Sequence, residues 1–165
     1  MNEERIVLGS GTLYMIELPP SAWGNGLSSY ITTDLPTDEE IEIIDNILGS
    51  IKGGASLTYT PTYYEPKDDA GMVFGKYMTD EEAILKTGIM TINAEMLDKL
   101  IDTGQLLKTE TTRILKIGGA MNQVDKKYLI HFVHKDAVHG DIRVSIVGNN
   151  RTGLEFMFAK NNETT

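Results

Sequence analysis

The sequence predicts a mainly β protein, either a β-sandwich or a partly closed barrel, with one packed α-helix and long loops. Short runs of β-branched and aromatic residues recur along the chain between Gly, Pro, Asn and Asp, which is the pattern of strands joined by turns. One segment, residues 93–104, combines the apolar spacing and the terminal residues of a helix. The 165 residues are enough for one domain, which we expect to span residues 1–165.

The chain begins with two expected strands and a long loop. Residues 5–8 (RIVL) and 12–18 (TLYMIEL) flank a Gly-Ser-Gly turn, and two consecutive prolines end the second strand. Residues 19–36 are rich in Pro, Ser, Gly and Asn and are predicted as an irregular loop. Loops of this length in compact domains are usually functional or are ordered by a partner.

The central part of the chain predicts an extended hairpin in which residues 55–65 pair with residues 83–92, joined by a loop at 66–80. In the first strand, small hydroxyl side chains alternate with Leu57, Tyr59 and Tyr63, which we expect to pack. The hydroxyl side chains, expected to face water or a lumen, are Ser56, Thr58, Thr60 and Thr62. Pro61 cannot donate a ladder hydrogen bond and indicates a sheet edge or a bulge. Both faces of the second strand are apolar, so a neighbouring subunit could cover one of them.

The expected helix has recognisable ends. Asn93 is a suitable N-cap, Glu95 suits the positive end of the helix dipole, and Gly104 can terminate the helix. Its apolar stripe, expected in the core, is Met96, Leu97, Leu100 and Ile101.

Four strands are expected after the helix, at residues 111–119, 126–134, 141–148 and 153–160. Turns at 136–140 and 149–153 would join the last three into a meander.

The charge of the chain is strongly negative, with 24 acidic residues against 15 Lys and Arg and a net charge of -9. This sign opposes tight binding to nucleic-acid phosphates, so DNA is not an attractive ligand. The longest uncharged stretches are shorter than the roughly 20 apolar residues of a membrane helix. The N-terminus lacks the pattern of a signal peptide, and we expect synthesis in the cytoplasm and no membrane partner.

Six acids without an intervening base form a candidate lumenal or solvated face: Asp34, Asp38, Glu39, Glu40, Glu42 and Asp45. The apolar residues among them, expected to pack on the other side, are Ile41, Ile43, Ile44, Ile47 and Leu48. The sequence Thr-Asp-Glu-Glu at 37–40 and again at 79–82 matches a capping box. Local turn or helix-start chemistry explains these acids better than acid and base catalysis does.

The residues show no catalytic pattern, and we expect no enzyme activity, cofactor or metal. His131 and His134 differ by an odd number and therefore point to opposite faces of a strand, which disfavours a shared metal. The glycine-rich segments at 9–12 and 53–56 lack the spacing and the lysine of a phosphate loop. The chain has no cysteine, so a disulfide or a thiolate metal site is excluded.

The order of segments resembles that of a phage major tail protein, the tail tube subunit found in phages and phage-derived particles of Gram-positive bacteria. The similar segments are IVLGSGTLYMIEL, ILGSIKGGASLTYTPTYYE, TDEEAILKTGIMTINAEMLDKLI and YLIHFVHKDAVHGDIRVSIVGNNRTGLEFMFAKNNET. The resemblance implies a tail tube fold whose subunits form hexameric rings, and the rings stack into a hollow tube that conducts DNA and encloses a tape-measure protein. The implied partners are copies of the chain, the tape-measure protein, and tail terminator and baseplate proteins, with a sheath protein as a further candidate. The implied location is the host cytoplasm during assembly and then the virion tail, or a bacteriocin-like particle.

Residues of the central hairpin and its loop are the candidate subunit interface: Tyr59, Pro61, Tyr63, Tyr64, Met72, Phe74 and Tyr77.

Two other functions stay open from the sequence. A monomeric β-barrel could bind a small ligand in a cavity lined by Tyr59, Tyr63, Tyr64 and Phe74. An enzyme could use the segment 131–139, which holds the three histidines.

Overall fold

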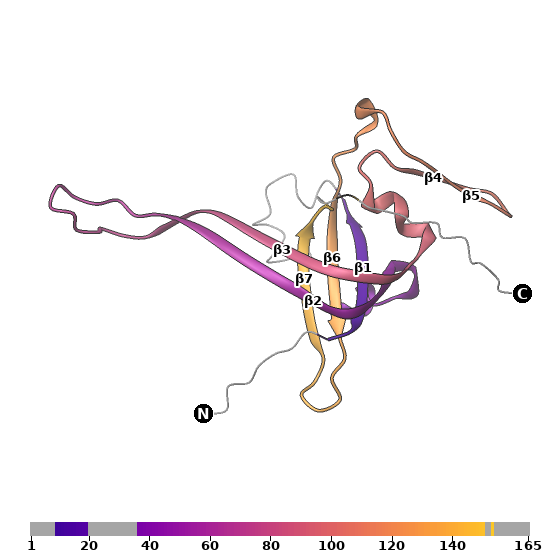
Figure 1. Cartoon of the computed structure of the whole chain (residues 1–165), viewed down its shortest axis with the longest axis horizontal. Helices are drawn as coiled ribbons and strands as arrows, with labels where there is room; N and C mark the ends of the chain where they lie inside the picture. Colours follow the sequence, from indigo (N-terminus) through magenta and orange to yellow (C-terminus); the bar gives the residue numbers. More distant parts are fainter. Residues whose placement is uncertain (1–8, 20–35, 151–152, 154–165) are drawn as a thin grey trace, which may run out of the picture.

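The structure is a computed structural model, and it describes residues 9–19, 36–150 and 153. The fold is mainly β and sandwich-like, as the sequence predicts, but the antiparallel sheets are not closed into a barrel. A five-stranded sheet has the order β3-β2-β1-β6-β7, and a separate two-stranded sheet contains β4 and β5 (Figure 1). The strands are β1 (Gly11–Leu18), β2 (Ile47–Tyr64), β3 (Tyr77–Ile92), β4 (Gln105–Lys108), β5 (Arg113–Lys116), β6 (Lys127–His134) and β7 (Ile142–Gly148). The short helices are α2 (Asp38–Ile41) and the 3-10 segments η2 (Ile44–Asn46), η3 (Ala94–Leu100) and η4 (Ala120–Asn122).

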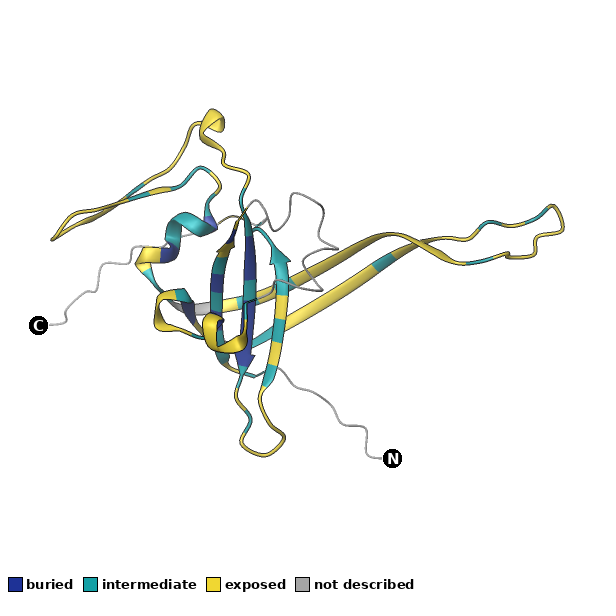
Figure 2. Ribbon diagram, turned by 180° about the vertical axis from the view of Figure 1, so that it is seen from behind, coloured by how far each residue is buried: buried dark blue, intermediate teal, exposed yellow. Residues whose placement is uncertain are grey.

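Strands β1 and β6 form the centre of the fold, because they are covered on both faces. On one face, Leu13, Met15 and Phe132 pack in a cluster that includes Met96 of η3. On the other face, Leu18 and Leu129 pack with Ile41 of α2. Figure 2 shows this concentration of buried residues in the middle of the sheet. We name β1 and β6 together the centre.

The central hairpin is confirmed and is longer than the sequence predicts. Strands β2 and β3 pair from Gly49 and Ile92 to Tyr64 and Tyr77. Only the first part of β2, up to Ile51, also pairs with β1. Beyond it, the two strands leave the sheet as a projecting ribbon (Figure 1). We name residues 55–87, which contain this ribbon and its tip, the arm.

A pair of glycines lies where β2 leaves the sheet. The pairing register with β3 shifts between Ile51 and Ala55. Gly53 and Gly54, with φ of 94° and 95°, lie in this irregular stretch. Such φ values disfavour L side chains, so the Gly-Gly sequence permits a bulge that bends the strand away from the centre.

Three sequence-based expectations in this region are wrong. The residues expected as a loop at 66–80 end in strand, since β3 starts at Tyr77. The second expected capping box, at 79–82, lies inside β3, where the Thr79 hydroxyl donates a hydrogen bond to the Thr62 carbonyl oxygen at 3.2 Å. Pairing with β2 therefore overrides the local helix-start signal. The expected α-helix at 93–104 is the shorter 3-10 segment η3.

The N-cap of η3 is confirmed and its expected end is not. The Asn93 side chain accepts a hydrogen bond from the Glu95 amide at 3.1 Å. The segment ends at Leu100, because the chain then turns: the Gly104 amide donates to the Ile101 carbonyl oxygen at 2.9 Å, and β4 begins at the next residue. Met96 and Leu100 are buried, as expected for the apolar stripe, whereas Leu97 and Ile101 are half-buried.

The C-terminal strands β6 and β7 form the expected hairpin, closed by a hydrogen bond from the Gly140 amide to the Asp136 carbonyl oxygen at 3.0 Å. The strand expected at 111–119 is shorter and pairs with β4, which the sequence did not predict. The expected strand at 5–8, the expected strand at 153–160 except for its first residue, and most of the loop at 19–36 lie outside the described residues. No helix in the described part of the chain has the length and apolar character needed to cross a membrane.

Candidate functional site

All seven candidate interface residues lie on the arm. Six are exposed, from 44% for Tyr63 to 75% for Phe74, and Pro61 is half-buried. The other exposed large apolar residues of the arm are Leu57, Val73, Met78 and Ile84. Leu57, Tyr59 and Tyr63, expected to pack, are thus about half exposed within this chain. Contiguous exposed apolar surface of this kind is typical of a contact site with another molecule.

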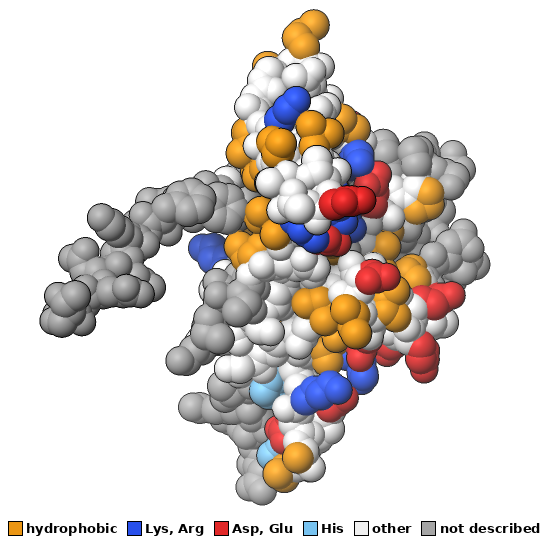
Figure 3. Space-filling model, turned by 90° about the vertical axis from the view of Figure 1, so that its right-hand side faces the viewer, with side chains coloured by type: hydrophobic (Ala, Val, Ile, Leu, Met, Phe, Trp, Pro, Cys, Tyr) orange, Lys and Arg blue, Asp and Glu red, His pale blue; other side chains and the backbone are white. Residues whose placement is uncertain are grey.

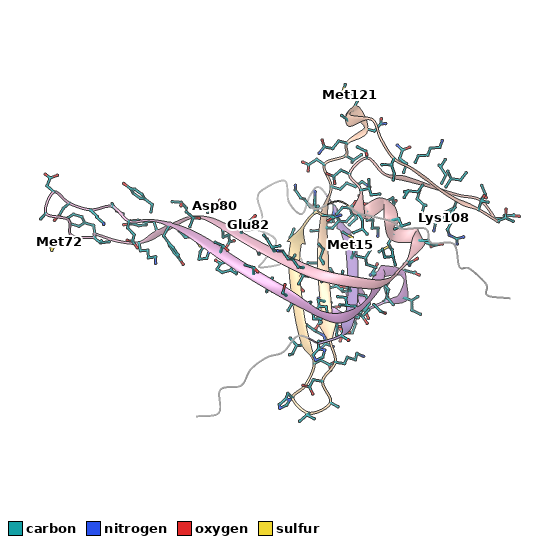
Figure 4. The ribbon with its side chains drawn as sticks, in the orientation of Figure 1. Met15, Met72, Asp80, Glu82, Lys108 and Met121 are labelled. Atoms are coloured by element: carbon teal, nitrogen blue, oxygen red, sulfur yellow. The ribbon has the colours of Figure 1, made fainter. Side chains whose placement is uncertain are left out.

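The arm has two chemically different faces, because residues opposite one another in an antiparallel ladder share a face and neighbours alternate. On one face the opposite pairs are Leu57 with Leu85, Tyr59 with Ala83, Pro61 with Glu81 and Tyr63 with Met78. On the other the pairs are Ser56 with Lys86, Thr58 with Ile84, Thr60 with Glu82, Thr62 with Asp80 and, next to the tip, Tyr64 with Tyr77. Figure 4 shows Asp80 and Glu82 along the arm. The expected hydroxyl face therefore exists between Ser56 and Thr62, and it also carries two carboxylates and the ammonium group of Lys86, whereas its end next to the tip is aromatic.

Polar contacts orient two aromatic side chains of the arm, Tyr59 and Tyr63. The Tyr59 hydroxyl donates a hydrogen bond to Glu81 Oε2 at 2.9 Å, and this contact raises the pKa of Tyr59 above its ordinary value. The ammonium of Lys76 lies 4.0 Å from the centroid of the Tyr63 ring and 3.9 Å from Glu65 Oε1. These contacts orient the rings before any partner binds, which lowers the ordering entropy that a contact would cost.

The tip of the arm is a hydrogen-bonded turn. Asp68 Oδ1 accepts from the amides of Ala70 and Met72 at 3.0 and 2.7 Å, and the Phe74 amide donates to the Pro66 carbonyl oxygen at 3.0 Å. These bonds hold the tip in one shape while Met72, 68% exposed, lies at the far end of the arm (Figure 4). The arm thus presents apolar side chains on a defined backbone.

A second exposed apolar surface, which the sequence did not single out, lies on the β4–β5 side of the molecule. It consists of Leu107, Ile114, Ile117, Met121 and Val124. Figure 3 shows apolar side chains interspersed with charged ones at this end, and Figure 4 places Met121 and Lys108 there, away from the arm. Glu95 of η3 anchors the small sheet through Lys108 at 2.7 Å and Arg113 at 2.8 Å, and these contacts lower the pKa of Glu95.

Most acids of the candidate solvated face are exposed in the described part of the chain, and Glu42 is half-buried. The Thr37 amide donates to Glu40 Oε2 at 2.8 Å, which confirms the reciprocal bond of the first expected capping box. Asp38, Glu39, Glu40 and Asp45 are exposed, and Asp38 and the half-buried Glu42 contact Arg143 of β7. Asp34 lies outside the described residues. Of the apolar residues in this segment, Ile41 and Leu48 are buried, but Ile43 and Ile44 are 45% and 82% exposed, contrary to expectation.

Asp38, Glu42, His131 and Arg143 form a charged cluster that sequence reasoning missed. Glu42 Oε1 lies 2.6 Å from Arg143 Nε and 3.4 Å from His131 Nε2. Arg143 Nε also lies 3.5 Å from Asp38 Oδ2. The Arg143 hydrogen bond is the main reason that the pKa of Glu42 is lowered. The sequence signal for this cluster was weak, since only the i, i+4 spacing of the two acids is local.

The buried ring of His131 connects the cluster to the centre. It lies across the ladder from Ser145, whose hydroxyl is 2.7 Å from His131 Nδ1, and its ring centroid is 6.2 Å from that of Tyr14. The other two histidines lie elsewhere: His134 Nδ1 is 2.7 Å from the Ser10 carbonyl oxygen, and His139 Nδ1 is 3.0 Å from Asp136 Oδ2. The three histidines therefore do not converge on one site.

The cluster also contains the one group in residues 9–19, 36–150 and 153 that could hold a metal. Ligand atoms of Asp38, Glu42 and His131 lie within 4.8 Å of one another. However, the guanidinium of Arg143 already pairs with both carboxylates, since its Nε lies 2.6 Å from Glu42 Oε1 and 3.5 Å from Asp38 Oδ2. A cation would have to displace this group, so the arrangement fits a structural ion-pair network that ties α2 to β7.

Comparison with protein-family models, with curated proteins and with solved structures finds no match to this chain.

Proposed function

We propose that the chain is a structural subunit that assembles with copies of itself through the arm, and that the assembly is a tube of stacked hexameric rings of the phage tail type. The observation that carries the proposal is the arm itself, a long ribbon with exposed aromatic side chains on a fixed backbone. A two-stranded ribbon is marginally stable alone, and an unpaired strand edge readily accepts another strand. Contacts with a neighbouring subunit would stabilise the ribbon and cover its unpaired strand edge.

The positions of the exposed surfaces support a ring. The arm and the β4–β5 surface lie at opposite ends of the molecule (Figure 1). Contact between two different surfaces of identical subunits is heterologous, and such contacts generate closed rings or helical filaments. The same two surfaces can therefore account for assembly without a second kind of protein. In the tube, a tape-measure protein and then DNA occupy the channel, and terminator and baseplate proteins cap it, with a sheath protein around a contractile form.

The charge of the arm supports a water-filled channel. Its hydroxyl face carries two acids, Asp80 and Glu82, against one base, Lys86, and the whole chain has a net charge of -9. Duplex DNA has one negative charge per about 1.7 Å of axis, so an acidic lining would repel it and limit adhesion during transit. The packing of the opposite face against a neighbour would direct this hydroxyl and acidic face to the channel or to solvent.

The ligand-binding alternative has less support. Tyr59, Tyr63, Tyr64 and Phe74 do not gather in the interior but lie along the exposed arm, and the sheet is not closed into a barrel. The separate locations of the three histidines likewise offer no observation that favours an enzyme at 131–139.

Negative-stain electron microscopy over a concentration series tests the proposal. We expect rings or hollow tubes at high concentration. The double variant Tyr63→Ser/Phe74→Ser should raise the concentration needed for assembly by more than about tenfold, as loss of interface hot spots does. The matched control Ile43→Ser/Ile44→Ser removes exposed apolar side chains outside the arm and should assemble like the unmodified chain.

Two results with the same samples would contradict the proposal. Compact particles at every concentration, with a monomer mass by light scattering, would exclude assembly. Assembly that is insensitive to both arm substitutions would exclude the arm as its contact surface. Hydrogen exchange adds a local readout: amides at 65–76 should be better protected in the assembly than in the free subunit.

A further inference from the structure

The two-stranded sheet of β4 and β5 has one face that the chain covers and one that it leaves exposed. Opposite residues of an antiparallel ladder share a face. On the covered face, Lys108 and Arg113 contact Glu95 of η3 at 2.7 and 2.8 Å. On the opposite face, which we name the outer face, Leu107 and Ile114 are 45% and 48% exposed. The remaining pairs are Leu106 with Leu115, half-buried on the covered face, and Gln105 with Lys116 on the outer face.

The outer face is apolar and carries a single charge. Lys116 is exposed and forms no salt bridge with any residue in the described part of the chain. The turn beside it is held by hydrogen bonds, since the Thr112 amide donates to Thr109 Oγ1 at 3.0 Å and the Thr109 amide donates to the Thr112 carbonyl oxygen at 2.9 Å. The outer face therefore presents aliphatic surface beside one ammonium group on a defined backbone.

The apolar face of the arm carries the opposite charge. Between Leu57 and Tyr63, its one charged side chain is Glu81, which lies opposite Pro61. Glu81 is exposed and forms no salt bridge among the described residues. The Tyr59 hydroxyl donates to Glu81 Oε2 at 2.9 Å, which holds the carboxylate at this face. Each of the two faces thus combines exposed apolar side chains with one charged group, and the two charges have opposite signs, so the faces are complementary.

A contact between these two faces joins two copies of the chain. The arm and the β4–β5 sheet lie at opposite ends of the molecule, so the arm does not reach the outer face of its own chain (Figure 1). Stacked sheets pack about 10 Å apart with interdigitated side chains, and two ribbons can pack in the same way. The arm segment of β2 is longer than the four residues of β4, so the arm can cover the whole outer face.

We propose that the outer face of one copy receives the apolar face of the arm of a second copy, with Lys116 beside Glu81 of that second copy. The inference rests on the proposed function and adds to it which faces meet and which charges pair. Each copy offers one arm and one outer face, so it binds one neighbour through its arm and another through its outer face. Such head-to-tail contacts give the assembly a direction and can close into a ring.

Charge reversal tests the pair, with the minimum concentration for assembly measured by light scattering. Lys116→Glu and Glu81→Lys should each raise this concentration by at least about tenfold, because like charges then meet in the contact. The double variant Lys116→Glu/Glu81→Lys should return to within about threefold of the unmodified chain, because opposite charges meet again. Lys135→Glu, the same change at an exposed residue of the β6–β7 turn, is the matched control and should assemble like the unmodified chain.

A mixture of the two single variants separates a contact between copies from an effect within one copy. In the mixture, the arm of each variant finds an outer face of opposite charge only on the other variant. We therefore expect the mixture to assemble at a concentration where neither variant assembles alone, with the two variants alternating in the product. A purification tag on one variant should then recover both variants in equal amounts.

The outcomes distinguish failure of this inference from failure of the proposed function. Unchanged assembly of either single variant would overturn the inference and leave the outer face to a different protein, while the proposed function would stand. Loss of assembly in both single variants without recovery in the mixture would also overturn it, since the two charges would then act at separate contacts. Failure of the unmodified chain to assemble would refute the proposed function and the inference with it. Circular dichroism checks the fold of each variant, and both substituted residues are exposed.

Discussion

The centre and the arm are both antiparallel β-structure, yet they differ in what covers their side chains. In the centre, Met15 and Phe132 are 1% and 0% exposed, because η3 covers one face of β1 and β6 and α2 covers the other. In the arm, Tyr64 and Phe74 are 60% and 75% exposed. The comparison teaches that the large apolar residues of the sheet are buried where η3 or α2 packs against them. Those of the arm have no such cover and stay available for contacts with other molecules.

The arm is connected to the centre through its base. Ala55 and Leu85 are partly buried and pack against the core cluster, and further out no such packing is found for the described apolar side chains. The ribbon is therefore held at one end and projects into solvent at the other. The transition occurs within a few residues of the Gly-Gly bulge.

The largest expected difference between the two regions concerns a matched pair of phenylalanines. Phe132→Ala in the centre should lower the free energy of unfolding by about 3–5 kcal/mol, because it removes a fully buried ring and leaves a cavity. Phe74→Ala on the arm should change it by no more than about 0.5 kcal/mol. Urea unfolding followed by circular dichroism, under conditions where the chain is a monomer, measures both values. Similar losses for the two variants would show that the arm contributes to the fold of the single chain.

A smaller difference in stability is expected between alanine substitutions at two glycines, Gly11 in the centre and Gly148 on the outer strand. A Cβ added to Gly11 would clash with the Val133 carbonyl oxygen and lie 2.6 Å from the Phe132 ring, so Gly11→Ala forces β1 and β6 apart. We expect a loss of about 1–3 kcal/mol in the free energy of unfolding. At Gly148, on the outer strand, a Cβ would have no atom of the described residues within 4 Å, and Gly148→Ala should change the free energy of unfolding by no more than about 0.5 kcal/mol. Equal stability of the two variants would contradict the close packing of the centre.

The smallest effect concerns pH and the charged cluster at the border of the centre. The pKa of Glu42 is lowered in the folded chain, mainly by Arg143, so its ionised form favours folding. This contribution is present above the unfolded pKa of about 4.3 and is lost as the pH falls through the lower folded pKa. Glu42→Gln should therefore lower the urea midpoint at neutral pH and flatten its decrease in acid, whereas Glu39→Gln, an exposed neighbour, should retain the decrease. An identical acid profile for Glu42→Gln and the unmodified chain would refute this role.

Much of the fold could be predicted from local signals. The strands β1, β6 and β7 and the pairing of β2 with β3 followed from runs of β-branched and aromatic residues between turn residues. The N-cap at Asn93 and the capping box at Thr37 were also identified, because side chains within three residues make these contacts. All seven candidate interface residues were placed correctly on one hairpin, although their role in assembly remains a proposal.

Other features depended on contacts between distant parts of the chain. The β4–β5 surface was missed, since β4 is four residues long and its anchor, Glu95, lies on η3. The charged cluster was missed because Glu42, His131 and Arg143 come from three elements that only the sheet order brings together. The capping-box sequence at 79–82 was misread, since ladder pairing with β2 outweighs a local helix-start preference.

The sequence by itself determined the mainly β character of the chain, most of its strands and the alternation of apolar and hydroxyl side chains along the arm. These features depend on backbone preference and on a period of two residues, both of which are local. Only the tertiary structure decided which apolar residues are buried. The two short helical segments cover β1 and β6 and leave the arm uncovered, and burial depends on where those covers lie in space rather than on the strand's own pattern.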